Sequence, residues 1–553
     1  MQLTGAEILI ECLLEQEVDT LFGFPGGAVL NIYDALYHYK DRIRHILTSH
    51  EQGAAHAADG YARASGKVGV CLATSGPGAT NLVTGIATAY MDSIPMVAIT
   101  GNVALPLLGK DSFQEVDIKG ITMPITKHNF IIKSVDELAT VVRRAFKIAK
   151  EGRPGPVLID IPKDITAMKA DYQKASPEPV QKMYGPVSEK AINQALSFIR
   201  ESKKPMIYAG GGVIISDASE TLRQFAETVN APIALSLMGL GAFPATHPLY
   251  TGMIGMHGTK ASNLTATACD LLITIGARFS DRVISKSERF APNARILQID
   301  VDEAEVNKNI LTHCHVIGDV KAVLERLNSE LAHVERPEWL AGMAALKAKY
   351  PLSYKSDALT PQYILETIYN LTEGEALVST EVGQHQIWTA QHYKFTKPRT
   401  FFSSGGLGTM GYGLGACMGA QIARPDKRVF NIAGDGSFRM NLNELATAVE
   451  YNLPIIVVIM NNHVLGMVRQ WQNMFYDSRF SNTTLDRGTD FVKLAEAFGA
   501  VGYHLSRKED TERIFKDALA QGRPVVVNCE IDRDLKVFPM VPPGDAIENV
   551  IVE

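Results

Sequence analysis

Short runs of apolar and β-branched residues recur along the chain, and stretches with helical periodicity separate them. Buried strands that alternate with helices and end in Gly or Pro turns are typical of parallel sheets covered by helices. The clearest runs lie at 68–74, 96–100 and 156–162, at 205–213, 232–236, 271–278 and 295–302, and at 376–383, 428–433, 454–460 and 524–532. This rhythm predicts an α/β protein with three doubly wound parallel-sheet domains.

Two polar stretches interrupt the rhythm. Residues 170–189 contain three prolines and no apolar periodicity, as in a linker, and residues 347–362 form a weaker break. A chain of 553 residues also exceeds the size at which single hydrophobic cores stop growing. We therefore predict domains at 1–172, 188–345 and 360–553.

Composition and charge exclude several classes of protein. Hydrophobic residues make up 46% of the chain and charged residues 21%, which is usual for globular domains. A net charge of -6 offers no basic surface to nucleic acid or to a membrane, and no apolar run approaches the ~20 residues of a membrane span. Residues 1–20 mix acidic with apolar side chains, unlike a signal peptide. We expect a cytoplasmic protein with no nucleic-acid or membrane partner.

The cysteines are far apart, with no CxxC pair and no Cys/His zinc spacing. We expect them to be reduced residues of the core, as in cytosolic proteins. They are Cys12, Cys71, Cys269, Cys314, Cys417 and Cys529.

The last third holds a Gly-Asp-Gly turn and an Asn-Asn pair, each directly after a predicted strand. The turn is 434–436 and the pair is 461–462, and the 24 residues between them fit one helix and one parallel strand. Both motifs are therefore expected at the carboxyl edge of one sheet, where open α/β folds bind ligands. A carboxylate, an amide oxygen and phosphate oxygens suit Mg²⁺, and N–H groups at a helix start hold phosphate. Gly-Asp-Gly alone is a common turn, so the prediction of a metal site depends on the Asn-Asn pair that follows at this spacing.

The two motifs resemble the diphosphate and metal motif of thiamine diphosphate (ThDP) enzymes. The resemblance implies that the side chains of Asp435 and Asn462 and the main-chain carbonyl of Val464 hold the metal. It also implies that Met410 is the apolar wedge that bends ThDP and that the Gly408 carbonyl accepts from its 4′-amino group. Without the resemblance, a Met among glycines would be read as a core residue. By the same resemblance, the diphosphate contacts come from Gln384, His385, Gly434, Gly436 and Ser437. A lone His after a strand, such as His385, is otherwise more often a hydrogen-bonding residue than a ligand.

The pyrimidine half of the coenzyme would meet loops of the first domain. Glu51 opens an alanine-rich helical stretch. In ThDP enzymes a Glu at this position reaches the N1′ atom across a subunit interface and promotes removal of the C2 proton, a task that an apolar setting favours. A Glu at a helix start is otherwise a dipole partner, so this assignment depends on its context. Loops 24–28, with Gly27, and 74–79 would cover the pyrimidine, although each alone is a tight turn.

Strand-end loops of the middle domain carry glycines or an acid that can meet ribose or phosphate. In their order they resemble the FAD-binding domain of the acetohydroxyacid synthase family, also called acetolactate synthase. The resemblance implies a FAD with a structural role, because the net reaction has no redox step. The residues are Gly210, Gly211, Gly212, Arg278, Asp300 and Asp319.

The resemblance to the catalytic large subunit of this family extends over essentially the whole chain, and the string Leu-Gly-Met-Val-Arg-Gln-Trp-Gln at 465–472 is its most discriminating part. It implies that pyruvate is decarboxylated on ThDP and that the hydroxyethyl unit passes to a second pyruvate or to 2-ketobutyrate. Arg282 matches the residue that binds the acceptor carboxylate, which suits a guanidinium group. Residues of the alkyl pockets are matched by Phe113, Met256 and Trp471, and an active-site neighbour by Gln114.

Several residues leave alternatives open. Taken alone, Trp471 is compatible with a core position, and Arg282 with a surface pair to Asp281. Ser280, Glu381 and Gly415 stand where the family usually has Asp, Asp and Pro. Lys127 also matches a position near the active site, with less support than Gln114.

Three other functions remain open from the sequence. The first is a catabolic acetolactate synthase without flavin, which Gly101-Asn102-Val103 favours but the flavin-type loops and the string at 465–472 argue against. The second is a flavin enzyme of the pyruvate oxidase kind. The third is a non-catalytic nucleotide-binding protein, against which Glu51, Asp435 and Asn462 argue. We expect a homodimer as the minimum assembly, because Glu51 and the metal motif belong to domains that meet across subunits in this family. A homotetramer is also compatible with the sequence. Valine feedback would require a separate small regulatory subunit.

Overall fold

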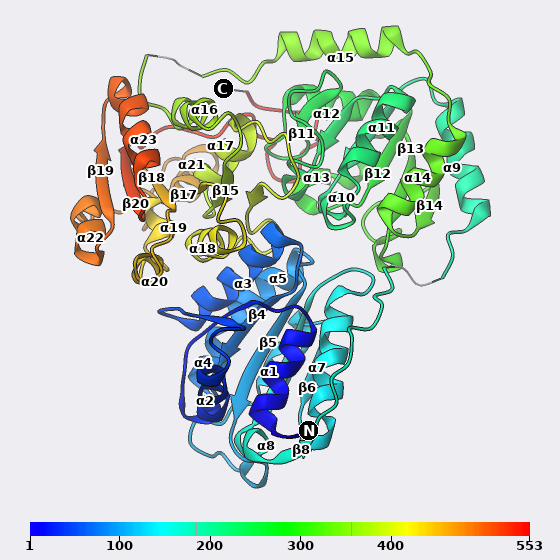
Figure 1. Cartoon of the computed structure of the whole chain (residues 1–553). Helices are drawn as coiled ribbons and strands as arrows, with labels where there is room; N and C mark the ends of the chain where they lie inside the picture. Colours follow the sequence, from blue (N-terminus) through cyan, green and yellow to red (C-terminus); the bar gives the residue numbers. More distant parts are fainter. Residues whose placement is uncertain (183–184, 355–356, 553) are drawn as a thin grey trace.

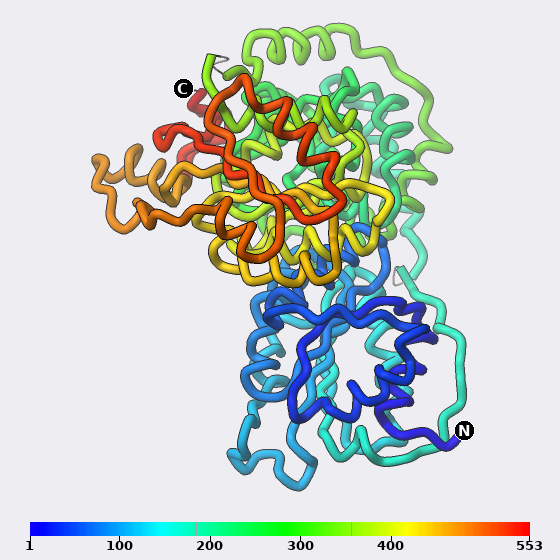
Figure 2. The backbone as a smooth tube through the Cα atoms, turned by 60° about the vertical axis from the view of Figure 1, so that its left-hand side comes forward, coloured from blue at the N-terminus to red at the C-terminus, as the bar shows by residue number. Residues whose placement is uncertain are grey.

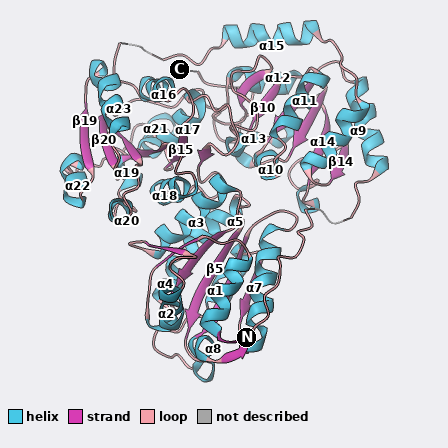
Figure 3. Ribbon diagram, in the orientation of Figure 1, coloured by secondary structure: helices cyan, strands magenta, loops and turns pink. Residues whose placement is uncertain are grey.

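The computed structural model describes residues 1–182, 185–354 and 357–552, and it contains three six-stranded parallel sheets (Figure 1). Helices cover the faces of each sheet, as Figure 3 shows. The prediction of an α/β protein with three doubly wound domains is confirmed. The sheets lie within residues 20–162, 205–317 and 377–530, while the domain limits at 1–172, 188–345 and 360–553 stay predictions. Residues 183–184 and 355–356, in the two predicted breaks, lie outside the described residues.

The first sheet grows from the apolar runs 68–74, 96–100 and 156–162, whose strands are fully buried. An antiparallel pair, β1 (Gln2–Thr4) and β8 (Lys169–Asp171), joins the two ends of this domain. The sheet has the order β3 (Arg44–Leu47), β2 (Thr20–Gly23), β4 (Gly69–Ala73), β5 (Met96–Asn102), β7 (Pro156–Pro162) and β6 (His128–Ile131). Its helices are α1 (Gly5–Glu15), α2 (Leu30–His38), α3 (Glu51–Ser65), α4 (Pro77–Asn81), α5 (Val83–Met91), α6 (Ile118–Thr122), α7 (Val135–Lys150) and α8 (Lys163–Ala167).

The third sheet repeats the strand order of the first. Numbered within each sheet, both have the order 2-1-3-4-6-5. The strands are β16 (Phe401–Phe402), β15 (Leu377–Thr380), β17 (Val429–Gly434), β18 (Ile456–Asn461), β20 (Val525–Glu530) and β19 (Val501–Leu505). The helices are α16 (Pro361–Leu371), α17 (Gln384–His392), α18 (Gly413–Ala423), α19 (Asp435–Phe438), α20 (Glu444–Glu450), α21 (Gly466–Phe475), α22 (Phe491–Phe498) and α23 (Thr511–Ala520).

The middle sheet has the order 3-2-1-4-5-6, which is that of dinucleotide-binding folds. Its strands are β11 (Tyr250–Met253), β10 (Ile233–Leu235), β9 (Pro205–Ala209), β12 (Leu271–Ile275), β13 (Arg295–Asp300) and β14 (Cys314–Ile317). Its helices are α9 (Glu189–Glu201), α10 (Gly211–Ile215), α11 (Ser219–Val229), α12 (Lys260–Ala268), α13 (Asp281–Ile284) and α14 (Val320–Glu330). Helix α15 (Pro337–Lys349) then leads toward the third domain (Figure 1).

Each sheet has a switch point, a place where successive connections leave in opposite directions, and open α/β sheets bind ligands beyond the carboxyl ends of the strands there. The switch lies between β2 and β4, between β9 and β12, and between β15 and β17. The loops singled out from the sequence follow these strands. Topology therefore explains why short glycine-rich segments, far apart in the chain, gather at three ligand-binding edges.

The first and third domains meet where α3 and α18 pack in backbone contact, the blue and yellow helices in the centre of Figure 1. A methyl group on Gly60 would overlap the carbonyl oxygen of Ala416, and one on Gly419 would overlap that of Ala57. Figure 2 shows the first domain below the other two. The joint between the domains thus requires glycine on both helices.

The chain after β20 returns to the middle domain. The Val541 amide donates to the Met256 carbonyl at 2.8 Å, and Lys260 Nζ donates to the Val550 carbonyl at 3.3 Å. Ile547 is buried in a cluster with side chains of the middle domain. The segment predicted as the end of the third domain therefore packs on the second.

The residues between Gly436 and Asn461 contain the expected helix, α20, and the expected strand, β18; the short helix α19, which begins at Asp435, is an addition. In the turn between α19 and α20, Asn441 Nδ2 donates to the Gly411 carbonyl at 2.7 Å. The expected geometry is confirmed, because Gly434 pairs with Met460 in parallel register and both motifs therefore leave one edge of the sheet.

The cysteine prediction is also confirmed, since all six side chains are buried and free. Burial raises the pKa of the Cys71 and Cys269 thiols to about 12, which keeps them protonated. Among the described residues, the helices are too short or too polar to cross a membrane.

We predict that Gly419→Ala destabilises the protein, because the new methyl group must push α18 off α3. Overpacking of this kind costs about 1 to 3 kcal/mol or more. The matched control is Gly342→Ala in α15, where nothing lies near the new methyl group and the lost chain entropy of glycine makes the change neutral or stabilising by about 0.5 to 1 kcal/mol. Thermal unfolding of both variants checks the opposite signs, and a midpoint for Gly419→Ala at or above that of the parent contradicts the close packing.

Candidate active site

A cavity of about 930 Å³ lies where the three domains meet. It is lined by strand-end loops of the middle domain, by the loop 404–410 and helix α21 of the third, and by the end of α5 from the first. Ten of the predicted site residues line it: Gly211, Gly212, Met256, Arg278, Arg282, Asp300, Asp319, Gly408, Met410 and Trp471.

Asp435 lies at the edge of the third sheet where the sequence predicts a metal site. Its side chain is only 1% exposed, yet neither carboxylate oxygen has a hydrogen-bond partner within the described residues. Burial raises the pKa of Asp435 to about 6. A buried carboxylate without a partner is costly, and a cation supplies the missing partner. The donor set of Asp435, Asn462 and the carbonyl of Val464 consists of oxygens only, so these residues fit Mg²⁺.

A chain of buried amides orients Asn462. Its Nδ2 donates to Gln384 Oε1 at 3.2 Å, and Gln384 Nε2 donates to Gln470 Oε1 at 3.1 Å. Gln470 in turn donates to the Val537 carbonyl at 3.0 Å. Among the residues that the structure describes, the Asn462 oxygen accepts only from the Val464 amide, at 3.3 Å, which leaves a lone pair that a cation could use. Gln384 therefore orients Asn462, whose metal ligation stays a prediction, as does the diphosphate contact of Gln384 itself.

His385 and the glycines around it form a second unpartnered group. Its Nε2 atom is buried and has no hydrogen-bond partner among the described residues, and burial lowers the pKa of the ring to about 3. The imidazole is therefore neutral. Its ring lies over Gly434 and Gly383, where an added Cβ would come within 2.8 and 2.9 Å of ring atoms. The buried Ser437 hydroxyl lies at the same edge of the sheet, and Gly436 packs under Leu465 and Leu485.

The loop with Gly408 and Met410 projects into the cavity. Gly408 has φ +72°, which favours glycine, and an added Cβ would meet nothing within 4 Å. The base of this loop is held by Glu381, which accepts from the Gly411 amide at 2.7 Å, the Leu414 amide at 3.1 Å and the Ser437 hydroxyl at 2.9 Å. The residue that departs from the family pattern thus ties the expected ThDP wedge to the Gly-Asp-Gly-Ser turn.

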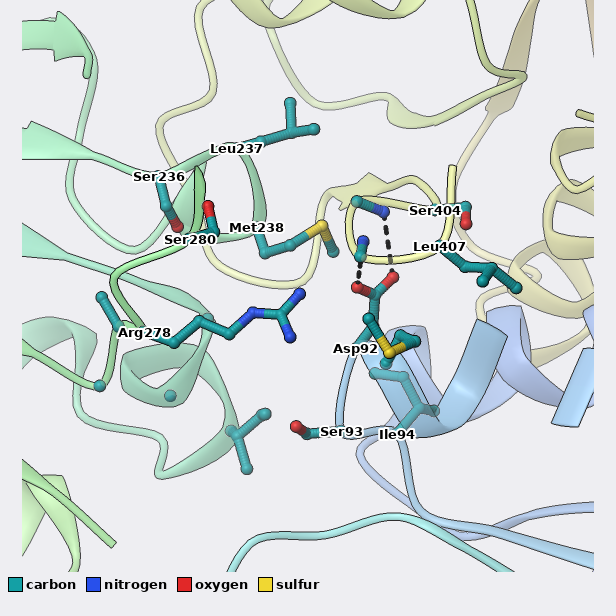
Figure 4. A pocket seen from close by; sticks show the side chains of 18 of the residues that line it. Asp92, Ser93, Ile94, Ser236, Leu237, Met238, Arg278, Ser280, Ser404 and Leu407 are labelled. Atoms are coloured by element: carbon teal, nitrogen blue, oxygen red, sulfur yellow. Dashed lines mark hydrogen bonds between the residues drawn. The ribbon is translucent and has the colours of Figure 1, made fainter. Parts of the chain in front are cut away.

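Asp92 holds the other side of the loop, and sequence reasoning missed it. Its carboxylate accepts from the Gly405 amide at 3.1 Å and the Gly406 amide at 2.7 Å, the two dashed bonds of Figure 4. The buried Arg63 bridges Asp92 and Asp59, at 3.0 and 2.6 Å. Asp59 and Arg63 stand four residues apart on an alanine-rich helix, which is the sequence signal that predicts such a pair.

Glycines at the switch point of the middle sheet allow the crossing of two loops. Gly210 and Gly212 pack against Gly276, which has φ +53°, and added Cβ atoms would come within 2.5 to 2.7 Å of its backbone. In Figure 4 the Arg278 side chain extends toward Met238 and Asp92. Burial raises the pKa of Asp300 to about 6. Together with the dinucleotide-type strand order, this lining fits a flavin nucleotide, although Asp319 Oδ1 is already used as the cap of α14.

The predicted substrate residues of the middle and third domains, Met256, Arg282 and Trp471, all line the cavity. The Met256 amide donates to the Arg282 carbonyl at 2.8 Å. Arg282 does form the expected pair with Asp281, at 3.5 Å, but both side chains are exposed, and such pairs contribute little. Trp471 is only half-buried, its indole N–H has no partner among the described residues, and it contacts Phe475 edge to face. Trp471 is therefore not a core residue.

The residues predicted for the pyrimidine half gather elsewhere. Asn81 Nδ2 donates to Glu51 Oε2 at 3.0 Å, and the Gln114 backbone packs on Gly76 of the loop 74–79. Gly27 opens toward free space, and the Phe113 side chain is 89% exposed. None of these residues lines the cavity. Within one chain the predicted residues therefore form two separate half-sites: one around the cavity and the metal motif, and one around Glu51 and the loop 74–79.

Lys127 does not join either half-site. Its Nζ donates to the carbonyls of Ile148 and Glu151 at 2.5 and 2.6 Å, at the end of α7. Burial lowers its pKa to about 8. A cation at a helix C-terminus stabilises the helix, so the role of Lys127 in the structure is capping.

Three models of thiamine pyrophosphate enzymes match the chain. The N-terminal TPP binding domain matches residues 3–121, the central domain 192–327 and the C-terminal TPP binding domain 381–529. The first two ranges contain both strands of their switch points, and the third begins directly after β15 and contains the loop that follows it.

Curated relatives match over nearly the whole length. The chain is 47% identical to an acetolactate synthase of Mycobacterium leprae, covering 99% of this chain and 90% of the relative. It is 46% identical to the acetolactate synthase isozyme 2 large subunit of Escherichia coli, covering 98% of each. It is 46% identical to a probable acetolactate synthase large subunit of Methanocaldococcus jannaschii, covering 99% of this chain and 95% of the relative. With this identity over full length, the chain belongs to the acetolactate synthase large-subunit family of thiamine diphosphate enzymes.

Proposed function

We propose that this chain decarboxylates pyruvate and joins the remaining two-carbon unit to a second 2-ketoacid. Pyruvate as acceptor gives 2-acetolactate, and 2-ketobutyrate gives 2-aceto-2-hydroxybutyrate, the first common step of branched-chain amino-acid biosynthesis. The observation that carries the proposal is the buried carboxylate of Asp435, which has no hydrogen-bond partner in the described part of the chain and lies at the same sheet edge as Asn462. Asp435 would also serve a protein that only binds a nucleotide and a metal, but such a protein has no use for a buried carboxyl such as Glu51 that promotes removal of the C2 proton.

ThDP supplies the electron sink for decarboxylation when it is bound. Asp435, Asn462 and the Val464 carbonyl would hold Mg²⁺, and the N–H groups near Gly436 and Ser437 would hold the diphosphate. Gly408 would accept a hydrogen bond from the pyrimidine, and Met410 would support its bent conformation. The Glu51 carboxyl would share a proton with the ring nitrogen of the pyrimidine.

FAD is proposed as a structural cofactor of the middle domain. The cavity beside Gly211, Gly212 and Arg278 supports this part of the proposal, since its wall is the loop that ends in Gly408 and Met410. A flavin there would stabilise that loop by mass action and take no part in electron transfer. The same cavity weighs against a catabolic enzyme without flavin.

Arg282 and Trp471 are the proposed acceptor residues. The exposed guanidinium of Arg282 is free to exchange its weak pair with Asp281 for the carboxylate of the acceptor. Trp471 and Met256 would line the alkyl slot, and Phe113 would enter it from another chain. A closed apolar slot also excludes water, which keeps the two-carbon unit for the ketoacid.

The active unit is proposed to be a homodimer, or a homotetramer built from dimers. The separation of Glu51, Gln114 and Phe113 from the cavity supports it, because a second chain can bring one half-site to the other. Two of the relatives above are named large subunits, which supports a small regulatory subunit as a further partner. We also propose that the protein acts in the cytoplasm.

We predict that Glu51→Gln lowers acetolactate formation by about 10²- to 10⁴-fold, the usual contribution of a general acid or base. The assay contains pyruvate, ThDP and Mg²⁺ and is run with and without FAD. Glu512→Gln, an exposed acid in the first turn of α23, is the control and should keep full activity. Activity of Glu51→Gln equal to that of the control would remove the proposed role of Glu51.

We predict that Asp435→Asn abolishes Mg²⁺-dependent binding of ThDP, because a neutral amide replaces the anionic metal ligand. Isothermal titration of the protein with ThDP, in the presence and absence of Mg²⁺, measures the effect. Asp426→Asn, at an exposed position before β17, is the matched control. ThDP binding to Asp435→Asn that still strengthens on addition of Mg²⁺ contradicts the metal assignment.

We predict that Trp471→Leu changes the preference between 2-ketobutyrate and pyruvate by about tenfold, because one methylene in a fitted apolar slot is worth about 1 to 3 kcal/mol. Competition of both acceptors in one reaction gives the ratio of products. Phe475→Leu, one turn along α21 and outside the cavity, is the control. An unchanged product ratio for Trp471→Leu places the acceptor slot elsewhere.

A further inference from the structure

The carboxylate of Glu444 is fully buried between the third and first domains. It belongs to the first turn of α20, and its side chain reaches the segment that leads into α3. Oε1 accepts from the His50 amide at 2.9 Å and Oε2 from the Ser49 amide at 3.1 Å. These are the two residues directly before Glu51. One carboxylate therefore satisfies both backbone donors of the entry to the helix.

The same face of α20 holds the rest of this segment. The Ser49 hydroxyl donates to the Asn443 carbonyl at 3.0 Å, and the Leu47 amide donates to the Tyr451 hydroxyl at 2.8 Å. Thr447 donates to Glu444 Oε2 at 2.7 Å and steadies the carboxylate. Positions 444, 447 and 451 lie on one helix face because they are three and four residues apart. Residues 47–50 are thus held along their length by one helix of the other domain.

Gly53, in the first turn of α3, contacts the same Glu444 side chain. A Cβ atom on Gly53 would overlap the Glu444 carboxylate. The first turn of α3 therefore sits directly on the Glu444 side chain. The far side of Glu51 is held by Asn81, which donates to its Oε2.

Removing the carboxylate would take the acceptor from the Ser49 and His50 N–H groups, whose hydrogen bonds are part-buried, and such groups find new partners by moving. Burial raises the pKa of Glu444, and the nearby Glu51 carboxylate adds to this, while the hydrogen bonds oppose it. The structure therefore places the Glu444 and Glu51 carboxyl groups close together although their charges repel. We attribute this costly arrangement to the geometry that Glu444 imposes on the start of α3.

We propose that Glu444 is a positioning residue that acts through Glu51: it fixes the turn into α3 and thereby the place at which the Glu51 carboxyl meets the coenzyme. The inference rests on the proposed function of Glu51. It also assigns a role to the third domain of each chain beyond holding its own metal and diphosphate.

The test compares Glu444→Gln with Glu450→Gln, an exposed acid at the end of the same helix. The measurement is the rate at which the C2 proton of bound ThDP exchanges with deuterium, read by acid quenching and proton NMR, with the dissociation constant of ThDP and the thermal midpoint beside it. We expect exchange and kcat of Glu444→Gln to fall by about 10²-fold, as for a misplacement near 1 Å, while Glu450→Gln matches the parent. The ThDP dissociation constant should change much less, because the metal and diphosphate residues are untouched.

A double variant separates positioning from a general loss of structure. Glu51→Gln/Glu444→Gln should exchange no more slowly than Glu51→Gln alone, because Glu444 acts through Glu51. Losses that multiply, or wild-type exchange in Glu444→Gln beside slow exchange in Glu51→Gln, overturn this inference alone. Wild-type exchange in Glu51→Gln overturns the proposed function of Glu51 itself. Should Glu444→Gln fail to fold, Gly53→Ala keeps the carboxylate but shifts the helix, and wild-type exchange in that variant likewise overturns the inference.

Discussion

The backbone contact between α3 and α18 is the constraint on which the site depends. A helix of 15 residues is roughly 22 Å long, and glycine at its crossing with α18 leaves no room for sliding. Its two ends therefore reach fixed places in the third domain. The start of α3 rests on Glu444 of α20, and near its end Arg63 donates to the Ser403 carbonyl at 3.1 Å, just before the loop with Gly408. One rigid helix sets the distance between the two coenzyme-binding edges of a chain.

Buried charge is treated in two different ways around this helix. Asp59, Arg63 and Asp92 satisfy one another, with the Tyr412 hydroxyl donating to Asp59 at 2.6 Å. A network with every member paired rigidifies the structure that contains it. Asp435 is the opposite case, because its carboxylate is as deeply buried and has no partner in the described protein. The contrast separates charged groups that stabilise the fold from a carboxylate whose missing partner a cation would supply.

The sequence predicted the parts of this protein that are local in the chain. The Gly-Asp-Gly turn, the Asn-Asn pair and the loops of the middle domain were found because a strand, a turn and a helix start stand next to each other. Asp92, Glu444 and Gln470 were missed because their partners lie hundreds of residues away or in a segment with no regular pattern, such as 535–537. The short helix α19 and the turn after it were missed for the same reason, because Asn441 in that turn donates to the Gly411 carbonyl, 30 residues earlier in the chain. Phe113 and Glu51 were predicted for one site, but no chain alone brings them to the cavity.

Two departures from the family pattern explain each other in the structure. A helix start is stabilised by proline in its first turn or by an anion near its N–H groups. Here the longer side chain of Glu381 places its carboxylate at the start of α18, where it accepts from the Gly411 and Leu414 amides, so the helix start does not need proline. Gly415 suits the packing instead, because an added Cβ would come within 2.7 Å of His56 Cβ on α3. With Glu381 and Gly415 in these two positions, the start of α18 is stabilised by a carboxylate at the end of β15 and not by a proline within the helix. Gly415 also preserves the close contact between α3 and α18.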